Sequence, residues 1–183
     1  EAMYHALMEG RFGVFDDCGT GKTAIANLLS PLVKAKLEAE GKEVYGRTLI
    51  VGPTSGTKAW RDALEGDETK RHFVDKKNVV WIAEEDKDNG FMKAVEGAES
   101  IYVNPEQLLL DVEVGGETKK VYQVLRDIGY DHLIVDEVQE VKNHSTKTKS
   151  GGVTESFAVR WLATVQGLEH VTLLSGPPMP DNL

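Results

Sequence analysis

The chain has 183 residues, of which 40% are hydrophobic and 28% are charged, and its formal net charge at pH 7 is −9. This length and composition predict one well-buried globular domain and exclude two domains of ordinary size. The acidic balance argues against a protein that coats nucleic acid through bulk electrostatics, although a local basic strip could still contact phosphates.

Strand-like apolar runs alternate with helical patterns, which predicts an α/β domain with a mainly parallel central sheet and helices on both faces. In chain order, we expect a strand at 13–15, a helix at 23–40, a strand at 48–51, a helix around Trp60 and Leu64, and a strand at 79–82. These are followed by a helix at 91–95, strands at 100–103 and 132–135, a helix at 154–165 and a strand at 171–174. A small β-hairpin is expected at 112–121, where two strand-like segments flank Gly115-Gly116.

A glycine-rich loop, Asp-Asp-Cys-Gly-Thr-Gly-Lys-Thr at 16–23, lies between the first strand and the long helix. Glycines suit a phosphate-binding loop because successive backbone N–H groups must turn inward around the anion. The following helix directs its N-terminal donors at the same anion. Lys22 is a candidate for the β- and γ-phosphates, and the Thr23 hydroxyl is a candidate Mg²⁺ ligand. The candidate ATP-binding residues are Cys18, Gly19, Thr20, Gly21, Lys22 and Thr23.

Two carboxylates, Asp136 and Glu137, end the apolar strand at 132–135. Asp136 is a candidate to hold Mg²⁺ through water, and Glu137 is a candidate base that activates the hydrolytic water. The alternative is that both are solvated charges that merely end a buried strand. The catalytic interpretation is favoured because a phosphate loop precedes this strand and a Ser-Gly-Pro-Pro turn follows the next one.

Several segments together carry a resemblance to the Swi/Snf-like ATPases of helicase superfamily two. Residues 16–23 look like that family's Asp-Glu-Met-Gly-Leu-Gly-Lys-Thr loop, in which an aspartate at the position of Asp16 is normal. Residues 133–143 resemble its Val-Asp-Glu-Ala-His-x-Leu-Lys-Asn segment, and residues 173–183 resemble Leu-Leu-Thr-Gly-Thr-Pro-Ile-Gln-Asn-Asn-Leu. Residues 51–54 with Trp60, and residues 103–108, are similar to two motifs on the family's DNA side.

The resemblance implies roles for residues that the motifs alone do not explain. Gln139 and Ser175 would couple the nucleotide site to the DNA-binding face. Thr54 and Ser55 would contact a DNA backbone phosphate. Two departures bear on the coupling role, because Gln139 stands where histidine is typical and Pro177 stands where the family has a threonine.

The resemblance also implies a three-layer RecA-like P-loop NTPase domain over residues 1–183, as the first, ATP-binding lobe of a longer motor. Family members have a second RecA-like lobe that supplies arginine fingers and half of the DNA track. An arginine finger is worth about 10³–10⁵ in rate, so we expect this lobe to bind ATP and hydrolyse it poorly. The implied cofactors are ATP and Mg²⁺, and the implied partners are the second lobe and double-stranded DNA.

Four functions remain open at this point. The leading hypothesis is the ATP-binding lobe of a translocase on double-stranded DNA, and a strand-separating helicase or restriction-type motor subunit is the runner-up. A nucleotide-binding switch module without turnover is a different class, which the presence of Glu137 disfavours because a pure binder needs no base. A P-loop kinase would need a lid rich in arginine, and the arginines of this chain do not form one.

The remaining signals concern compartment and side-chain roles. The single cysteine, Cys18, cannot form an intrachain disulfide, which fits a reducing cytosol or nucleus. We expect no membrane partner, because no apolar run approaches the length of a span and the first residues do not resemble a signal peptide. Trp60 and Trp81 are expected to pack in the core rather than stack on bases.

Overall fold

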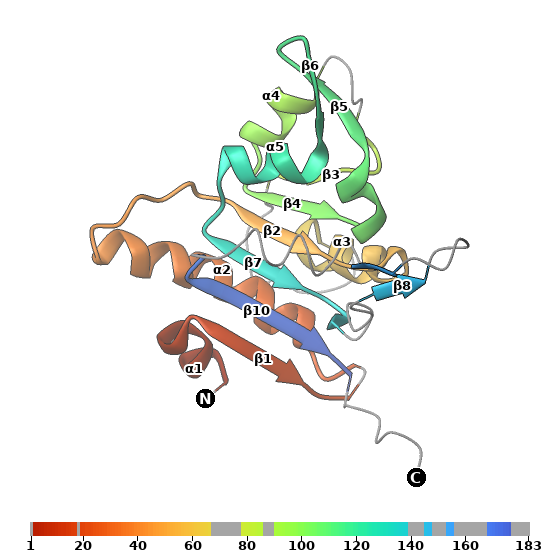
Figure 1. Ribbon diagram of the computed structural model, residues 1–183. Helices are drawn as coiled ribbons and strands as arrows, with labels where there is room; N and C mark the ends of the chain where they lie inside the picture. The colour runs from red at the N-terminus through yellow and green to blue at the C-terminus, as the bar shows by residue number, and fades with distance from the viewer. Residues whose placement is uncertain are drawn as a thin grey trace.

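The central sheet of the computed structural model, which describes residues 2–17, 19–66, 78–85, 90–138, 145–147, 153–155 and 168–176, is parallel throughout. Its strands are β1 (Arg11–Phe15), β2 (Thr48–Val51), β3 (Val79–Trp81), β4 (Ser100–Val103), β7 (His132–Val135) and β10 (His170–Ser175). They lie side by side in the order β1-β10-β7-β2-β4-β3 (Figure 1). Every residue of β2, β4 and β7 is buried, as expected for parallel strands covered on both faces.

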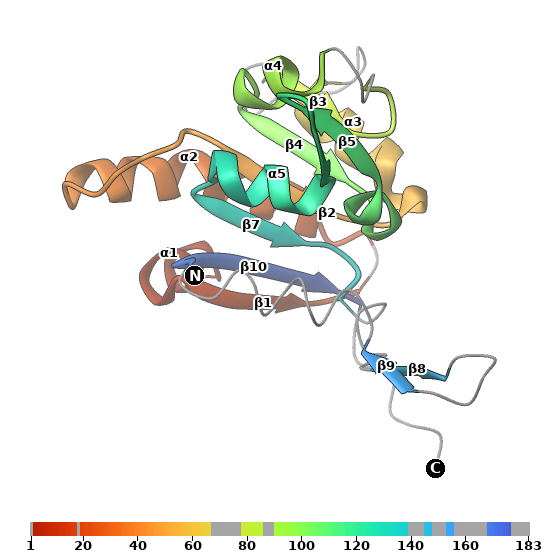
Figure 2. The same cartoon turned by 45° about the horizontal axis from the view of Figure 1, so that its top comes forward.

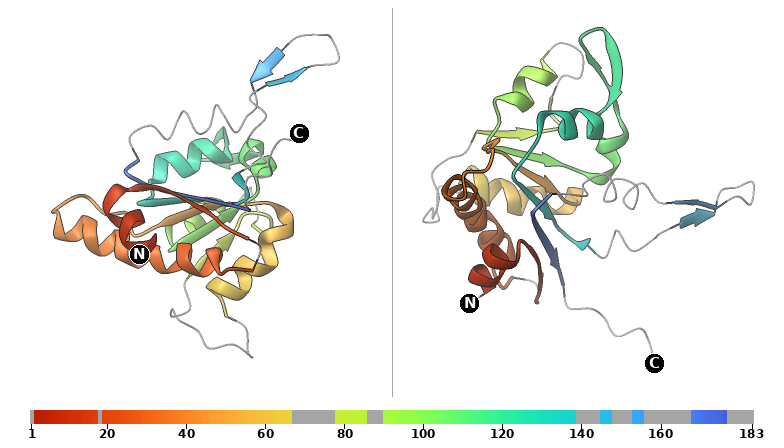
Figure 3. Two further views of the ribbon diagram at one scale, coloured as in Figure 1. Left: turned by 90° about the horizontal axis from the view of Figure 1, so that it is seen from below. Right: turned by 60° about the vertical axis from the view of Figure 1, so that its left-hand side comes forward.

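Helices cover both faces of this sheet, which confirms the predicted three-layer α/β architecture. The α-helices are α1 (Ala2–Glu9), α2 (Lys22–Ala39), α3 (Thr57–Leu64), α4 (Phe91–Glu96) and α5 (Val121–Ile128). Seen along the sheet, α2 and α3 lie on one face and α5 lies on the other (Figure 3). None of the helices in the described residues is long and apolar enough to cross a membrane.

Alternation along the strands divides the core between these two layers. On one face of the sheet, Leu49 and Leu133 pack in a cluster with Phe91 and Val95 of α4 and Leu125 of α5. On the other face, which α2 and α3 cover, Ile50, Tyr102 and Ile134 of the strands pack in a cluster with Trp60 and Leu64 of α3. The expected core position of Trp60 is therefore confirmed, because its side chain has no exposed surface.

The predicted hairpin is present as β5 (Asp111–Val114) and β6 (Glu117–Lys120), which pair antiparallel. Gly115 and Gly116 connect them with φ values of 62° and 85°, a conformation that glycine adopts without strain. Helix α5 follows directly and was not predicted. Its signal was present in the sequence, since Val121, Val124 and Leu125 recur at helical spacing and are buried.

One predicted helix is wrong at its start. Residues 154 and 155 of the helix expected at 154–165 belong to strand β9 (Val153–Glu155), which pairs antiparallel with β8 (Ser145–Lys147). This second hairpin projects from the body of the domain (Figure 2). The β-branched pair Thr146 and Thr154 lies in register across it, and such residues favour strands over helices. Residues 156–165 lie outside the described residues.

Two buried histidines lie side by side at the amino ends of β7 and β10, where His132 and His170 are in register. His132 Nδ1 lies 3.2 Å from Ser30 Oγ, and its Nε2 lies 2.8 Å from Thr172 Oγ1. Neither ring nitrogen of His170 has a hydrogen-bond partner in the described part of the chain. Burial lowers the pKa of His170, and the nearby Lys36 ammonium lowers it further. Glu169, at 3.9 Å from Nε2, opposes that shift.

Lowering the pH is expected to destabilise the fold through His170. Because its pKa is lower in the folded state, the unfolded chain binds the proton more tightly, so stability falls as the pH drops below about 6.5. His170→Leu removes two unpaired nitrogens and should flatten this dependence between pH 7.5 and 5.5, measured by urea unfolding. His5→Gln, at an exposed histidine of α1, is the control. An unchanged pH dependence in H170L would contradict the assignment.

Candidate active site

The predicted site residues that the structure describes lie at one edge of the sheet, because parallel strands end at the same edge. The glycine-rich loop follows β1, the Thr54 segment follows β2, Asp136 follows β7, and β10 ends at Ser175. Their strands are neighbours or near neighbours in the order β1-β10-β7-β2. Motifs far apart in the sequence therefore share one edge of the sheet (Figure 1).

The loop between β1 and α2 depends on the conformation of two glycines. Gly19 and Gly21 have φ values of 84° and 88°, in the left-handed region that side chains disfavour. Helix α2 begins immediately after Gly21, whose carbonyl accepts from Ile25 N at 3.0 Å. The loop therefore turns directly into a helix N-terminus, the geometry in which backbone donors surround an anion.

Lys22 lies across the loop and binds the loop's own backbone. Its Nζ donates to Asp16 O at 2.6 Å and to Asp17 O at 2.8 Å. The Thr20 hydroxyl also donates to Asp17 O, at 2.8 Å. Asp16 N donates to Ser175 O at 3.3 Å, which joins the loop to the end of β10. Ser175 is thereby placed beside the candidate phosphate loop, and it is buried.

The Asp136 carboxylate is held by two donors. Its Oδ2 accepts from Trp60 Nε1 at 2.8 Å, and its Oδ1 accepts from Glu137 N at 3.0 Å. The backbone N–H of Asp136 donates to Val51 O at 2.8 Å, which anchors the residue against β2. Burial raises the pKa of Asp136, while the Trp60 hydrogen bond and the charge of Lys22 lower it. Burial is the largest of these contributions and the charge of Lys22 is the smallest.

Glu137 has an unusual backbone conformation. Its φ of 52° makes it the one non-glycine residue with positive φ among the described residues. Such a conformation costs about 1–3 kcal/mol and is found at functional sites more often than elsewhere. The sequence contained no signal for it, because glutamate, unlike asparagine or glycine, does not favour this region.

The donors at this edge suit Mg²⁺ bound together with a nucleotide. In the described ranges, no group of three or more His, Cys, Asp or Glu side chains could hold a metal ion by itself. Mg²⁺ is usually bound through one or two protein oxygens, with waters and substrate phosphates completing its shell. The Thr23 hydroxyl and the Asp136 carboxylate are such oxygens. A cation would also compensate the burial of Asp136, so these residues fit the ion.

The Thr54 segment forms a short 3-10 helix, η1 (Thr54–Gly56), directly after β2. Thr54 and Ser55 are exposed. Asn104 Nδ2 donates to Thr54 Oγ1 at 2.9 Å, and the Tyr102 hydroxyl donates to Pro53 O at 2.8 Å. Both contacts come from β4 and the residue that follows it, so the neighbouring strand holds the candidate DNA-contacting turn.

Sequence reasoning missed the residues that support the site. Trp60 was placed in a motif with residues 51–54 and predicted to pack in the core, but not to donate to Asp136, and no role was assigned to Tyr102. Asn104 was recognised in a motif, but not as a partner of Thr54. Two candidate site residues, Cys18 and Gln139, lie outside the described residues.

Comparison with solved structures supports the fold. Over 98% of this chain, the structure is similar to the Sulfolobus solfataricus SWI2/SNF2 ATPase core in complex with dsDNA, with a TM-score of 0.56 and 17% identity. Over 97% of the chain it is similar to the S. solfataricus SWI2/SNF2 ATPase core domain, with a TM-score of 0.50 and 17% identity. No protein-family model and no curated protein matches the sequence.

The similarity extends over nearly the whole chain but over a minority of each matched protein. The chain spans 30% of the first ATPase core and 29% of the second. At this identity the likeness shows the fold alone, which is the RecA-like α/β fold that the sequence resemblance implied.

Proposed function

We propose that this chain is the ATP-binding lobe of a DNA-dependent ATPase that couples ATP hydrolysis to movement on double-stranded DNA. The observation that carries the proposal is that the glycine loop with Lys22, after β1, and the Asp136 carboxylate, after β7, lie at the same edge of the sheet. A lysine at a helix N-terminus and a half-buried carboxylate at one sheet edge are what a Mg²⁺-nucleotide requires. The likeness to an ATPase core in complex with double-stranded DNA supports the choice of DNA as partner.

In this mechanism the loop residues Cys18 to Gly21 surround the phosphates with backbone N–H groups. Lys22 Nζ leaves the carbonyl oxygens of Asp16 and Asp17 and binds the β- and γ-phosphates. Thr23 and Asp136 would hold Mg²⁺, which would supply positive charge to neutralise the negative charge that develops on the phosphates. Glu137 accepts a proton from the attacking water.

The DNA side of the mechanism involves the turn after β2. Thr54 and Ser55 offer exposed hydroxyls for a backbone phosphate, a contact that positions DNA without reading its sequence. Ser175, hydrogen-bonded to the phosphate loop, and Gln139 would link nucleotide state to that face. Turnover by the 183-residue lobe is expected to be low, because a second lobe would supply an arginine finger worth about 10³–10⁵ in rate.

The test is ATP turnover by the full-length protein, second lobe included, with and without linear double-stranded DNA, and with single-stranded DNA as a separate arm. Stimulation by the duplex supports the proposed translocase. Stimulation by single strands alone would instead favour a strand-separating helicase. Tight ATP binding without turnover on any nucleic acid would contradict the motor and favour a nucleotide-switch module.

Lys22→Ala is expected to weaken ATP binding about 10- to 100-fold, since hydrogen bonds to charged groups contribute about 1.5–3 kcal/mol. Binding can be measured by titration with a fluorescent ATP analogue. Lys34→Ala is the matched control, because Lys34 is an exposed lysine of the same helix that pairs with Glu38 at 4.0 Å. Equal affinities of K22A and K34A would exclude Lys22 from the site.

A further inference from the structure

The indole of Trp60 is fully buried, and its N–H group donates a hydrogen bond. Trp60 lies on α3, and its side chain is fully enclosed between that helix and the sheet. Its Nε1–H donates to Asp136 Oδ2 at 2.8 Å, across 76 positions of sequence. A buried indole N–H needs an acceptor, and here the acceptor is the carboxylate assigned to Mg²⁺.

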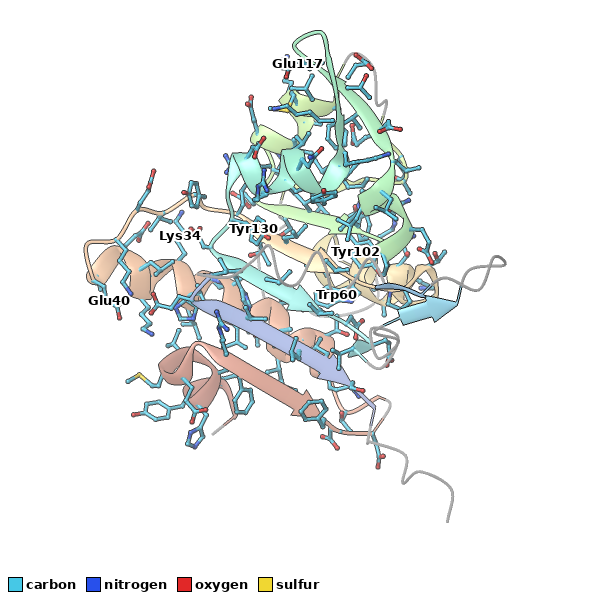
Figure 4. The ribbon with its side chains drawn as sticks, viewed as in Figure 1. Lys34, Glu40, Trp60, Tyr102, Glu117 and Tyr130 are labelled. Atoms are coloured by element: carbon cyan, nitrogen blue, oxygen red, sulfur yellow. The ribbon has the colours of Figure 1, made fainter. Side chains whose placement is uncertain are left out.

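The same contacts tie this carboxylate to the turn after β2. A Cβ placed on Gly56 would lie 3.5 Å from Asp136 Oδ2, so η1 passes close to that oxygen. The ring of Trp60 packs against Tyr102 with centroids 6.4 Å apart, and Tyr102 holds Pro53 O. Figure 4 shows Trp60 and Tyr102 near the carboxyl ends of the strands. Asp136, Trp60 and η1 therefore form one packed unit.

The hydrogen bond from Trp60 Nε1–H fixes the orientation of the Asp136 carboxylate. The terminal torsion of an aspartate is soft, so without a donor on Oδ2 the group can rotate. With Trp60 on Oδ2 and Glu137 N on Oδ1, the remaining lone pairs keep a defined direction.

We propose that Trp60 is a positioning residue that fixes the Asp136 carboxylate for Mg²⁺ through its indole N–H and links that carboxylate to the Thr54–Gly56 turn. The inference rests on the proposed function. It assigns to helix α3 a part in metal binding that packing alone would not require.

The chain contains a matched control in Trp81. Its indole also donates to a carboxylate, Glu65 Oε1, and its ring packs against the other side of the same cluster, 5.1 Å from Tyr102. Glu65 lies just after α3 and does not belong to the candidate site. Trp60→Phe and Trp81→Phe therefore remove the same group from the same cluster, with only the first touching Asp136.

The test compares the affinity for a fluorescent ATP analogue in Mg²⁺ and in EDTA. We expect W60F to lose about tenfold in the presence of Mg²⁺ and little in EDTA, and W81F to match the wild type in both. The Mg²⁺ concentration for half-maximal turnover should rise by a similar factor in W60F alone. If W60F fails to fold, benzothienylalanine at position 60 keeps the shape and removes the N–H.

Equal Mg²⁺-dependent affinities of W60F and W81F would overturn the inference while leaving the proposed function intact. Equal losses in Mg²⁺ and in EDTA would also overturn it, since they would indicate a packing effect on the whole site. Absence of Mg²⁺-dependent nucleotide binding by the wild type would defeat the proposed function, and this inference with it.

Discussion

Replacing Glu137 with glutamine is expected to reduce ATP turnover by about 10²–10⁴-fold, the usual contribution of a general base, while leaving ATP binding unchanged. Glutamine has the same size as glutamate, and it tolerates the backbone conformation of residue 137, with φ at 52°, as well as glutamate does. The amide, however, cannot accept a proton from water. Phosphate release in the presence of double-stranded DNA gives the rate, and titration with a fluorescent ATP analogue gives the affinity.

The control for this variant is Glu99→Gln. Glu99 is exposed at the opposite, amino-terminal edge of the sheet, just before β4. A general effect of losing one negative charge would appear in both variants, whereas loss of the base appears only in E137Q. Wild-type turnover retained by E137Q would exclude Glu137 as the base.

The second large effect is expected from Asp136→Asn. The charge stabilisation that a metal ion provides in a transition state is worth several kcal/mol, so turnover should fall about 100-fold or more. The amide oxygen can still accept from Trp60 Nε1, so the local packing is kept. Turnover as a function of Mg²⁺ concentration measures the effect, and an unchanged Mg²⁺ dependence would remove Asp136 from the metal site.

The same variant is expected to be more stable than the wild type at pH 7 without Mg²⁺. Burial raises the pKa of Asp136, so the folded state binds its proton more tightly than the unfolded chain does. Its contribution to stability is therefore full below about pH 3.8 and is lost as the pH rises through the folded pKa. The stability gain of D136N should accordingly shrink as the pH is lowered toward 4, measured by thermal unfolding.

Asp131→Asn provides the contrasting control, at the amino end of the strand that Asp136 follows. Asp131 precedes β7, and its carboxylate accepts from Tyr45 N at 2.9 Å and from Gly46 N at 2.6 Å. D131N should therefore lose stability while keeping the Mg²⁺ dependence of turnover. D136N is thus expected to gain stability and to lose the Mg²⁺ dependence of turnover, as a functional carboxylate would. D131N is expected to lose stability and to keep that dependence, as a structural carboxylate would.

Local patterns were sufficient where the neighbours of a residue in sequence decide its conformation. The strand at 132–135 was predicted because three consecutive apolar residues, Leu133 to Val135, precede two carboxylates, and the structure has β7 at His132–Val135. Gly19 and Gly21 could be assigned to a tight loop because only glycine adopts their φ values without strain. The error at 154–155 arose where a helical pattern competed with pairing to a strand that the sequence did not reveal.

The sequence by itself determined the α/β class, the six strands of the central sheet in chain order, and the identity of Lys22 and Asp136 as site candidates. Only the tertiary structure decided that Trp60 donates to Asp136 and that Asn104 holds Thr54. It also decided the left-handed backbone of Glu137. The reason is physical: in a parallel sheet every neighbouring strand is reached through a crossover, so contacts at the strand ends join residues from distant segments. Their partners depend on strand order and register, which no local pattern encodes.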